Sequence, residues 1–255
     1  MKSRSLMKKL SLYYPSSLRE KWDRGGLMVS RLPVEIKKIL LCLDFDDEIY
    51  DFAVKNKPDL IITHHPFLFG SKMRVLNGDP VKKDLYERLE KNNMPVCSYH
   101  TNFDNAFPCG MNDELAERLE LENIRPLETA SMARGGTLKA PMEVHDFAKY
   151  AKEKLDVSYC LLINEGKPVV SKVAIIGGGG SREYLNALDE GYDIYISGDC
   201  PHHTRRDIVL RHFNYLDMPH EIEKAFMSRM KKTLLEIDPS LEIITIDHER
   251  LPEVI

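Results

Sequence analysis

KKILLCLDF (37–45) and PDLIIT (58–63) decide the fold of this chain, and the segment EIYDFAVKN (48–56) lies between them. Both outer stretches are short and almost continuously apolar, which is typical of strands buried on both faces of a parallel sheet. Asp46 or Asp47 is suited to cap the helix expected over the middle segment. This order of strand, helix and strand predicts a βαβ unit and therefore an α/β fold.

The rest of the chain continues the alternation of strands and helices. Further helices are expected over 3–14, 80–92, 112–120 (with Asn112 as N-cap), 142–155, 182–191, 204–212 and 219–235. Further strands are expected over 94–100, 135–140, 158–164, 172–177, 193–197, 213–218 and 241–247. We therefore predict two similar α/β lobes, 1–125 and 126–255, with sheets flanked by helices and facing a shared metal cleft. The final helix and strand could return to the first lobe.

An internal similarity links the two predicted lobes. KVAIIG (172–177), a helix and DIYIS (193–197) are followed by His202 and His203, and the first lobe has the same order of elements before its own histidine pair. Two explanations stay open, a duplication that brings both pairs to one cleft or the general likeness of βαβ units.

The bulk composition describes an ordinary globular chain. Of its 255 residues, 43% are hydrophobic and 30% charged, and the net charge of −4 does not indicate a broad nucleic-acid surface. The basic N-terminal segment lacks the apolar core of a signal peptide, and no apolar run is long enough to span a membrane. The five cysteines form no CxxC pair, which favours a reducing compartment. The predicted location is the cytoplasm.

His64 and His65 end the strand PDLIIT, and ligands of open α/β sheets bind beyond the carboxyl ends of strands. Imidazole is a common ligand of zinc, iron and manganese. Adjacent side chains on an extended chain point in opposite directions, so the pair would serve two ions rather than one.

VCSYHTNFD (96–104) ends another strand and supplies His100 and Asp104. A carboxylate can ligate one ion or bridge two, and a histidine beside it can orient a ligand through a hydrogen bond. The alternative is a capping aspartate and a packed histidine.

DMPHEIEKAF (217–226) places His220 and Glu223 three residues apart, on one face of the expected helix. This spacing occurs in dinuclear carboxylate sites. The alternative is a solvated helix start, where acidic residues are favoured. Taken together, the three clusters supply enough histidines and carboxylates for two divalent ions (zinc, iron or manganese).

Two glycine-containing turns have more than one interpretation. SGDCPHHT adds Asp199, His202 and His203, which could contact substrate or support the ligands. GGGGS (177–181) could expose backbone N–H groups to a phosphate, or could be only a tight turn.

Over nearly its whole length, the chain resembles the dinuclear-metal-centre family of GTP cyclohydrolase I type 2 homologues, also called NGG-interacting-factor-three-like proteins. The motifs that carry the resemblance are WDRGGL (22–27), LIITHHPFLF (60–69), YHTNFDNAFPCGMNDELAERL (99–119), SGDCPHH (197–203) and the His220 segment.

The resemblance implies two similar α/β lobes and a toroidal homohexamer. The metal ligands that it implies are His64, His65, Asp104, His220 and a glutamate that bridges both ions. The residues that it places beside them, with expected catalytic roles, are His100, His202 and His203.

The last ligand segment departs from the family pattern, which has glycine before the final histidine and glutamate four residues after it. Here Pro219 and Lys224 occupy those positions. A spacing shortened by one residue makes Glu223 the expected ligand, and Glu221 is the alternative.

The expected function is that of a metal-dependent hydrolase acting on a nucleotide such as GTP, in which His100, His202 or His203 moves protons. Family likeness does not fix a reaction. A nucleotide phosphoesterase and a non-catalytic metal-binding scaffold or regulatory interaction protein are the alternatives.

Overall fold

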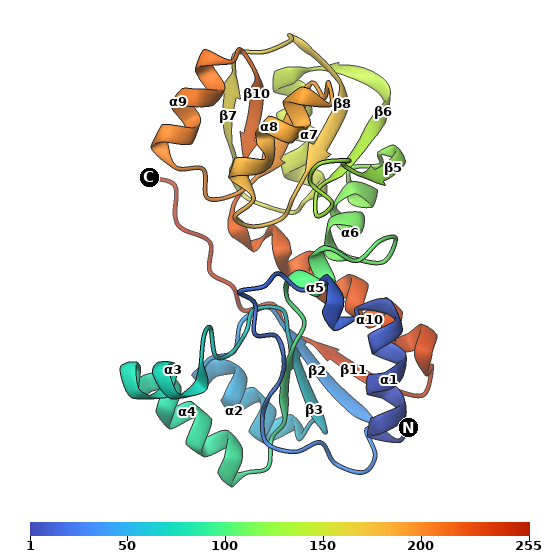
Figure 1. The fold of residues 1–255 in the computed structure, drawn as a ribbon, viewed down its shortest axis with the longest axis vertical. Helices are drawn as coiled ribbons and strands as arrows, with labels where there is room; N and C mark the ends of the chain where they lie inside the picture. Colours follow the sequence, from blue (N-terminus) through green and yellow to red (C-terminus); the bar gives the residue numbers. More distant parts are fainter. The chain divides into compact units, whose positions relative to one another are not determined.

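The computed structural model describes residues 1–255, and the chain divides into two compact units. The first contains Met1–Ala106 and Phe226–Glu249, and the second contains Phe107–Ala225 and Arg250–Ile255. Each unit has its own mixed sheet with helices beside it, which confirms the predicted α/β class (Figure 1). None of the helices combines the length and the apolar character that crossing a membrane requires.

The first unit is built on a five-stranded sheet in the order β1-β4-β3-β2-β11, in which only β1 runs antiparallel to its neighbour. Its strands are β1 (Gly26–Val29), β2 (Lys38–Cys42), β3 (Leu60–Thr63), β4 (Val96–Ser98) and β11 (Glu242–Thr245). Its helices are α1 (Ser3–Tyr13), the 3₁₀ turn η1 (Ser16–Leu18), α2 (Asp47–Asn56), α3 (Lys72–Gly78), α4 (Pro80–Lys91), α5 (Thr101–Asp104) and α10 (Ala225–Ile237). Because β11 pairs with β2, the end of the chain completes the first sheet.

Helices cover both faces of this first sheet. On one face, α2 and α4 pack against every second residue of the strands in a core cluster, because successive side chains of a strand point to opposite faces of the sheet. The cluster includes Leu40, Cys42, Ile49, Ala53, Ile61, Leu85, Leu89 and Val96. Figure 1 shows α1 and α10 on the other side of the sheet, and the hydroxyls of Tyr14 and Thr233 join them at 2.7 Å. The predicted cap of α2 is confirmed, since Asp46 accepts a hydrogen bond from the backbone N–H of Ile49.

The second unit is built on a six-stranded sheet in the order β5-β6-β8-β9-β10-β7, with a parallel centre (β8, β9, β10) and antiparallel edges. Its strands are β5 (Glu122–Pro126), β6 (Arg134–Glu143), β7 (Leu161–Asn164), β8 (Val169–Ile175), β9 (Ile194–Ser197) and β10 (Asn214–Asp217). Its helices are α6 (Met111–Arg118), α7 (Val144–Lys154), α8 (Tyr184–Asp189) and α9 (His202–Leu210), with 3₁₀ turns η2 (Ser181–Glu183) and η3 (His220–Lys224).

The structure corrects two predicted helix starts. Gly110 caps α6, and the side chain of Asp113 accepts its backbone N–H at 2.8 Å, so the prediction of Asn112 as N-cap was wrong. Asn112 is instead buried and accepts the backbone N–H of Gly177 at 2.8 Å. The last helix begins as the 3₁₀ turn η3 and becomes α-helical only at Ala225.

Candidate metal centre

His64 follows β3 directly and is completely buried. Its Nδ1 lies 2.9 Å from the backbone oxygen of Tyr99. Because a carbonyl oxygen only accepts hydrogen bonds, we assign the ring proton to Nδ1. Nε2 of the neutral ring then carries the lone pair that a metal ion requires.

His65, the next residue, is oriented by a carboxylate. Its Nδ1 lies 2.8 Å from Oδ2 of Asp44, which follows the end of the neighbouring strand β2. Burial alone would raise the pKa of Asp44, but the hydrogen bond and charge of His65 outweigh burial and lower it. A carboxylate on one ring nitrogen fixes the tautomer and raises the basicity of the other nitrogen. Sequence reasoning missed Asp44, although its place at the end of the buried run LLCL was a usable signal.

Asp104, in the short helix α5, lies beside these histidines. It is 5% exposed, and its Oδ1 is 3.6 Å from Nε2 of His64. Two donors on one tetrahedral ion, each about 2.0–2.1 Å from it, lie about 3.3 Å apart. The observed spacing is close to this value. The ring nitrogens of His64, His65 and His100 also come within 4.8 Å of one another.

His100 is oriented by Asp23 of the WDRGGL motif. Its Nδ1 lies 3.5 Å from Oδ1 of Asp23, and its ring packs edge-on against Trp22. Asp23 also accepts hydrogen bonds from Thr101 and from the backbone of Gly25. Burial would raise the pKa of Asp23, but these hydrogen bonds, led by that of His100, hold it well below its usual value. The motif thus supplies a fixed acceptor for His100.

In the second unit, η3 brings His220 and Glu223 together. Residues three apart eclipse one another in a 3₁₀ helix, and Nε2 of His220 lies 3.0 Å from Oε2 of the buried Glu223. Nδ1 of His220 contacts Asp199 Oδ2 at 2.6 Å. Glu223 and then Asp199 raise the pKa of His220 to about 9, so a metal ion has to displace a proton from this ring. Glu221, the alternative ligand, lines a neighbouring pocket.

The glycine-rich turn after β8 makes room for this pair. Gly178 has φ +64°, and a Cβ placed on it would lie 2.0 Å from Oε1 of Glu223 and 3.1 Å from Nε2 of His220. The backbone N–H groups of Gly177 and Gly180 donate to Asn112 and Ser197 at 2.8 and 2.9 Å. These two N–H groups are therefore not available to a phosphate, and the turn has a packing role.

Replacing Gly178 with alanine is expected to remove much of the bound metal, because the new methyl group would displace the Glu223 carboxylate. Gly191→Ala is the matched control. Gly191 has φ +76° but open space at its Cβ position, so its substitution costs only about 1–2 kcal/mol of backbone strain. Metal content by elemental analysis should fall in the first variant and stay normal in the second. Equal metal content in both would contradict the assigned role of Gly178.

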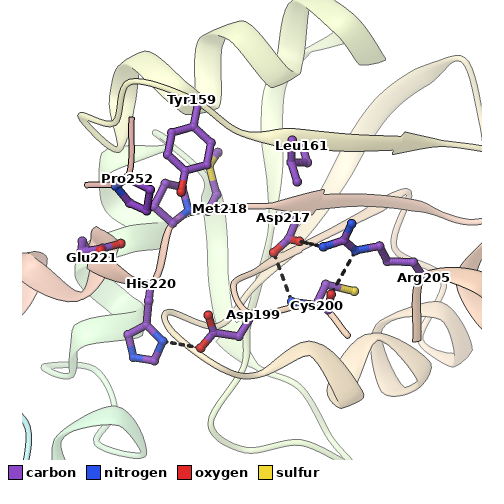
Figure 2. A pocket seen from close by; sticks show the side chains of 11 residues that line it. Tyr159, Leu161, Asp199, Cys200, Arg205, Asp217, Met218, His220, Glu221 and Pro252 are labelled. Carbon is purple, nitrogen blue, oxygen red and sulfur yellow. Dashed lines mark hydrogen bonds and ion pairs between the residues drawn. The ribbon is translucent and has the colours of Figure 1, made fainter. Parts of the chain in front are cut away.

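His202 and His203 are placed differently from the other predicted histidines. Both are exposed in the first turn of α9, beyond the segment 198–201 that follows β9. A cavity of about 330 Å³ is lined by Asp199 and His220 but by neither of these histidines (Figure 2). Their predicted catalytic roles stay predictions.

The donors of both units fit a divalent ion of borderline hardness. The three candidate ligand histidines have the same arrangement, with Nδ1 held by an oxygen and Nε2 directed to a carboxylate or the histidine cluster. Imidazole nitrogens and carboxylate oxygens suit zinc, iron and manganese. A buried His/Glu or His/Asp pair is thus suited to metal binding in each unit.

A model of the Duf34/NIF3 (NGG1p interacting factor 3) family matches residues 1–252. The chain belongs to this family. The match covers almost the whole chain and confirms the resemblance that the HHP and HTNFD motifs indicated.

Two Duf34/NIF3 relatives have the name "GTP cyclohydrolase 1 type 2 homolog". The protein of Methanocaldococcus jannaschii is 30% identical over 249 residues, which cover 97% of this chain and 100% of the relative. The protein of Streptococcus pneumoniae serotype 4 is 28% identical over 230 residues, covering 87% and 86%. The crystal structure of a Bacillus cereus protein related to NIF3 matches with a TM-score of 0.88 at 21% identity, covering 100% and 99%. At this identity the structural match shows the fold alone.

Proposed function

We propose that this chain binds two divalent metal ions and is a metal-dependent hydrolase that acts on a nucleotide such as GTP. The proposed ligands are His64, His65, Asp104, His220 and Glu223, with Glu223 bridging the ions. The observation that supports the proposal best is the arrangement shared by three histidines, each held at Nδ1 by an oxygen, with Nε2 directed to a carboxylate or to the histidine cluster.

The number of donors supports a site with open positions. Catalytic sites commonly use three protein ligands per ion and keep a position for water or substrate. Five protein ligands, one of them shared, match that pattern for two ions. Such ions, when bound, lower the pKa of a coordinated water and polarise the substrate.

His100 is the side chain best suited to move a proton at this site. It adjoins His64 and His65, and the strongly acidic Asp23 holds its Nδ1. An imidazole oriented in this way presents Nε2 for proton transfer. His202 and His203 are further proposed proton carriers, and their exposure on α9 gives them access to a ligand that approaches from solvent.

The substrate and the assembly rest on the family. The names of the two relatives suggest GTP as the first nucleotide to test. A toroidal homohexamer, which the resemblance to the family implies, and a cytoplasmic location, which the cysteine pattern favours, belong to the same proposal.

Metal-loaded protein is expected to convert GTP or a nucleotide phosphodiester, and to lose this activity when His65 is replaced with alanine. The test is incubation with manganese, zinc or iron(II), followed by chromatography of the products. Opening of the imidazole ring would identify a cyclohydrolase, and cleavage of the phosphodiester alone would identify a phosphoesterase. Full metal occupancy without turnover of any substrate would contradict the hydrolase and favour a binding scaffold.

A further inference from the structure

A pocket of about 330 Å³ adjoins the His220 segment within the second unit. Apolar and aromatic walls come from Tyr159, Leu161, Met218, Pro219 and Pro252. Figure 2 shows Tyr159 and Leu161 on one side of it, and His220, Asp199, Asp217 and Arg205 along the opposite side. Apolar walls with a few convergent polar groups are the usual make-up of a small-molecule site.

The charges of the pocket disfavour phosphate. Three carboxylates line it (Asp199, Asp217 and Glu221), and the basic groups beside them are the guanidinium of Arg205 and the imidazole of His220. The pKa of Tyr159 is raised by burial and then by these same three carboxylates, so their field reaches the aromatic wall. A pocket with excess negative charge attracts groups rich in N–H donors and repels anions. It therefore suits the base of a nucleotide rather than its phosphates.

Asp217 and Arg205 form the polar floor. Asp217, at the end of β10, is 9% exposed, and its Oδ1 accepts the backbone N–H of Cys200 at 3.3 Å. Its Oδ2 lies 3.6 Å from NH2 of Arg205, whose Nε donates to the backbone oxygen of Cys200 at 3.0 Å. The 3.6 Å contact is longer than a hydrogen bond, so the carboxylate and the guanidinium each keep capacity for a ligand.

We propose that this pocket binds a guanine-type base. Asp217 accepts hydrogen bonds from the ring N–H and the 2-amino group, Arg205 donates to the neighbouring carbonyl, and Tyr159 with Met218 forms the wall for the ring. Adenine lacks this pattern, because it presents an acceptor where guanine has a ring N–H and a donor where guanine has a carbonyl. The inference rests on the proposed function, in which the adjacent His220 is a metal ligand.

Direct binding of nucleosides separates this inference from the hydrolase proposal. Guanosine, which has no phosphate, is titrated into the metal-loaded full chain by calorimetry, beside inosine and adenosine. Guanosine should bind roughly 10- to 100-fold more tightly than adenosine, the range expected for one good bidentate contact, with inosine between them. Equal binding of guanosine and adenosine, or binding of neither, overturns the pocket assignment and leaves the metal centre standing. Guanosine binding without GTP turnover supports the pocket and counts against the hydrolase.

Asp217→Asn gives the sharper test. The amide oxygen of the new asparagine can still accept the backbone N–H of Cys200. Its NH₂ group then takes the place of Oδ2, so a hydrogen-bond donor faces the base where the aspartate offered an acceptor. Guanosine binding should fall by roughly tenfold or more, and xanthosine, which carries a carbonyl in place of the 2-amino group, should bind more tightly than to the unaltered chain. Asp189→Asn, which removes an equal charge at an exposed position of α8, should change neither affinity. Unchanged guanosine affinity in folded, metal-loaded Asp217→Asn overturns the proposal. If the variant does not fold, the difference between guanosine and adenosine affinity in the unaltered chain decides the question.

Discussion

Replacing Arg134 with methionine is expected to lower the free energy of unfolding by about 3–5 kcal/mol. Arg134 is completely buried at the start of β6, and its Nε lies 2.5 Å from Oδ1 of Asp113 on α6. Its NH1 also donates to the backbone oxygens of Ser131 and Met132, at 2.8 and 3.0 Å. The substitution leaves the buried Asp113 without its counter-charge. The free-energy cost of this unpaired carboxylate exceeds the stabilisation from the apolar contacts of the methionine side chain.

Arg125→Met is the control for this effect. Arg125 is half exposed and pairs with Glu190 at 3.3 Å, and water screens such a pair to about 0–1 kcal/mol. Both free energies are measured by urea unfolding followed by circular dichroism. A loss of similar size in the two variants would show that the Arg134–Asp113 pair does not hold α6 to the second sheet.

Replacing His64 with alanine, or Asp104 with alanine, is expected to remove one of the two proposed ions and with it most of any hydrolase activity. The atoms concerned, Nε2 of His64 and Oδ1 of Asp104, are 3.6 Å apart and both residues are buried, so they are proposed to share one ion. Elemental analysis after dialysis should give about one ion per chain in each variant. His145→Ala, which removes an exposed histidine on α7, should keep the full content. Normal metal in His64→Ala would remove this residue from the site.

The sequence predicted those features that depend on local pattern. Continuous apolar runs identified β2 and β3, and the four-residue spacing of Leu85 and Leu89 identified α4. The position of His64 and His65 after a buried strand was enough to mark them as candidates. The spacing of His220 and Glu223 was sufficient to predict that their side chains lie together, because residues three apart share a face in both α- and 3₁₀-helices.

What the sequence did not reveal depends on contacts between distant segments. Asp44 orients His65, which lies 21 positions later in the sequence, and Asp23 orients His100, which lies 77 positions later. No local sequence pattern joins either pair. The role of Gly178 becomes apparent only when Glu223 is seen beside it. Asn112 was assigned as a cap from its residue type, whereas a tertiary hydrogen bond to Gly177 draws it into the core. The edge strand β1 was missed because it is short, contains a glycine and buries only Val29.

The central claim, a two-ion centre built from five named side chains, is tested most directly by anomalous diffraction from crystals of the metal-loaded chain. Data collected on either side of the absorption edge should give two peaks per chain, each about 2.0–2.2 Å from the donor atoms of His64, His65, Asp104, His220 or Glu223. Glu223 should contact both peaks. A single peak, or two peaks that these side chains do not ligate, would contradict the account.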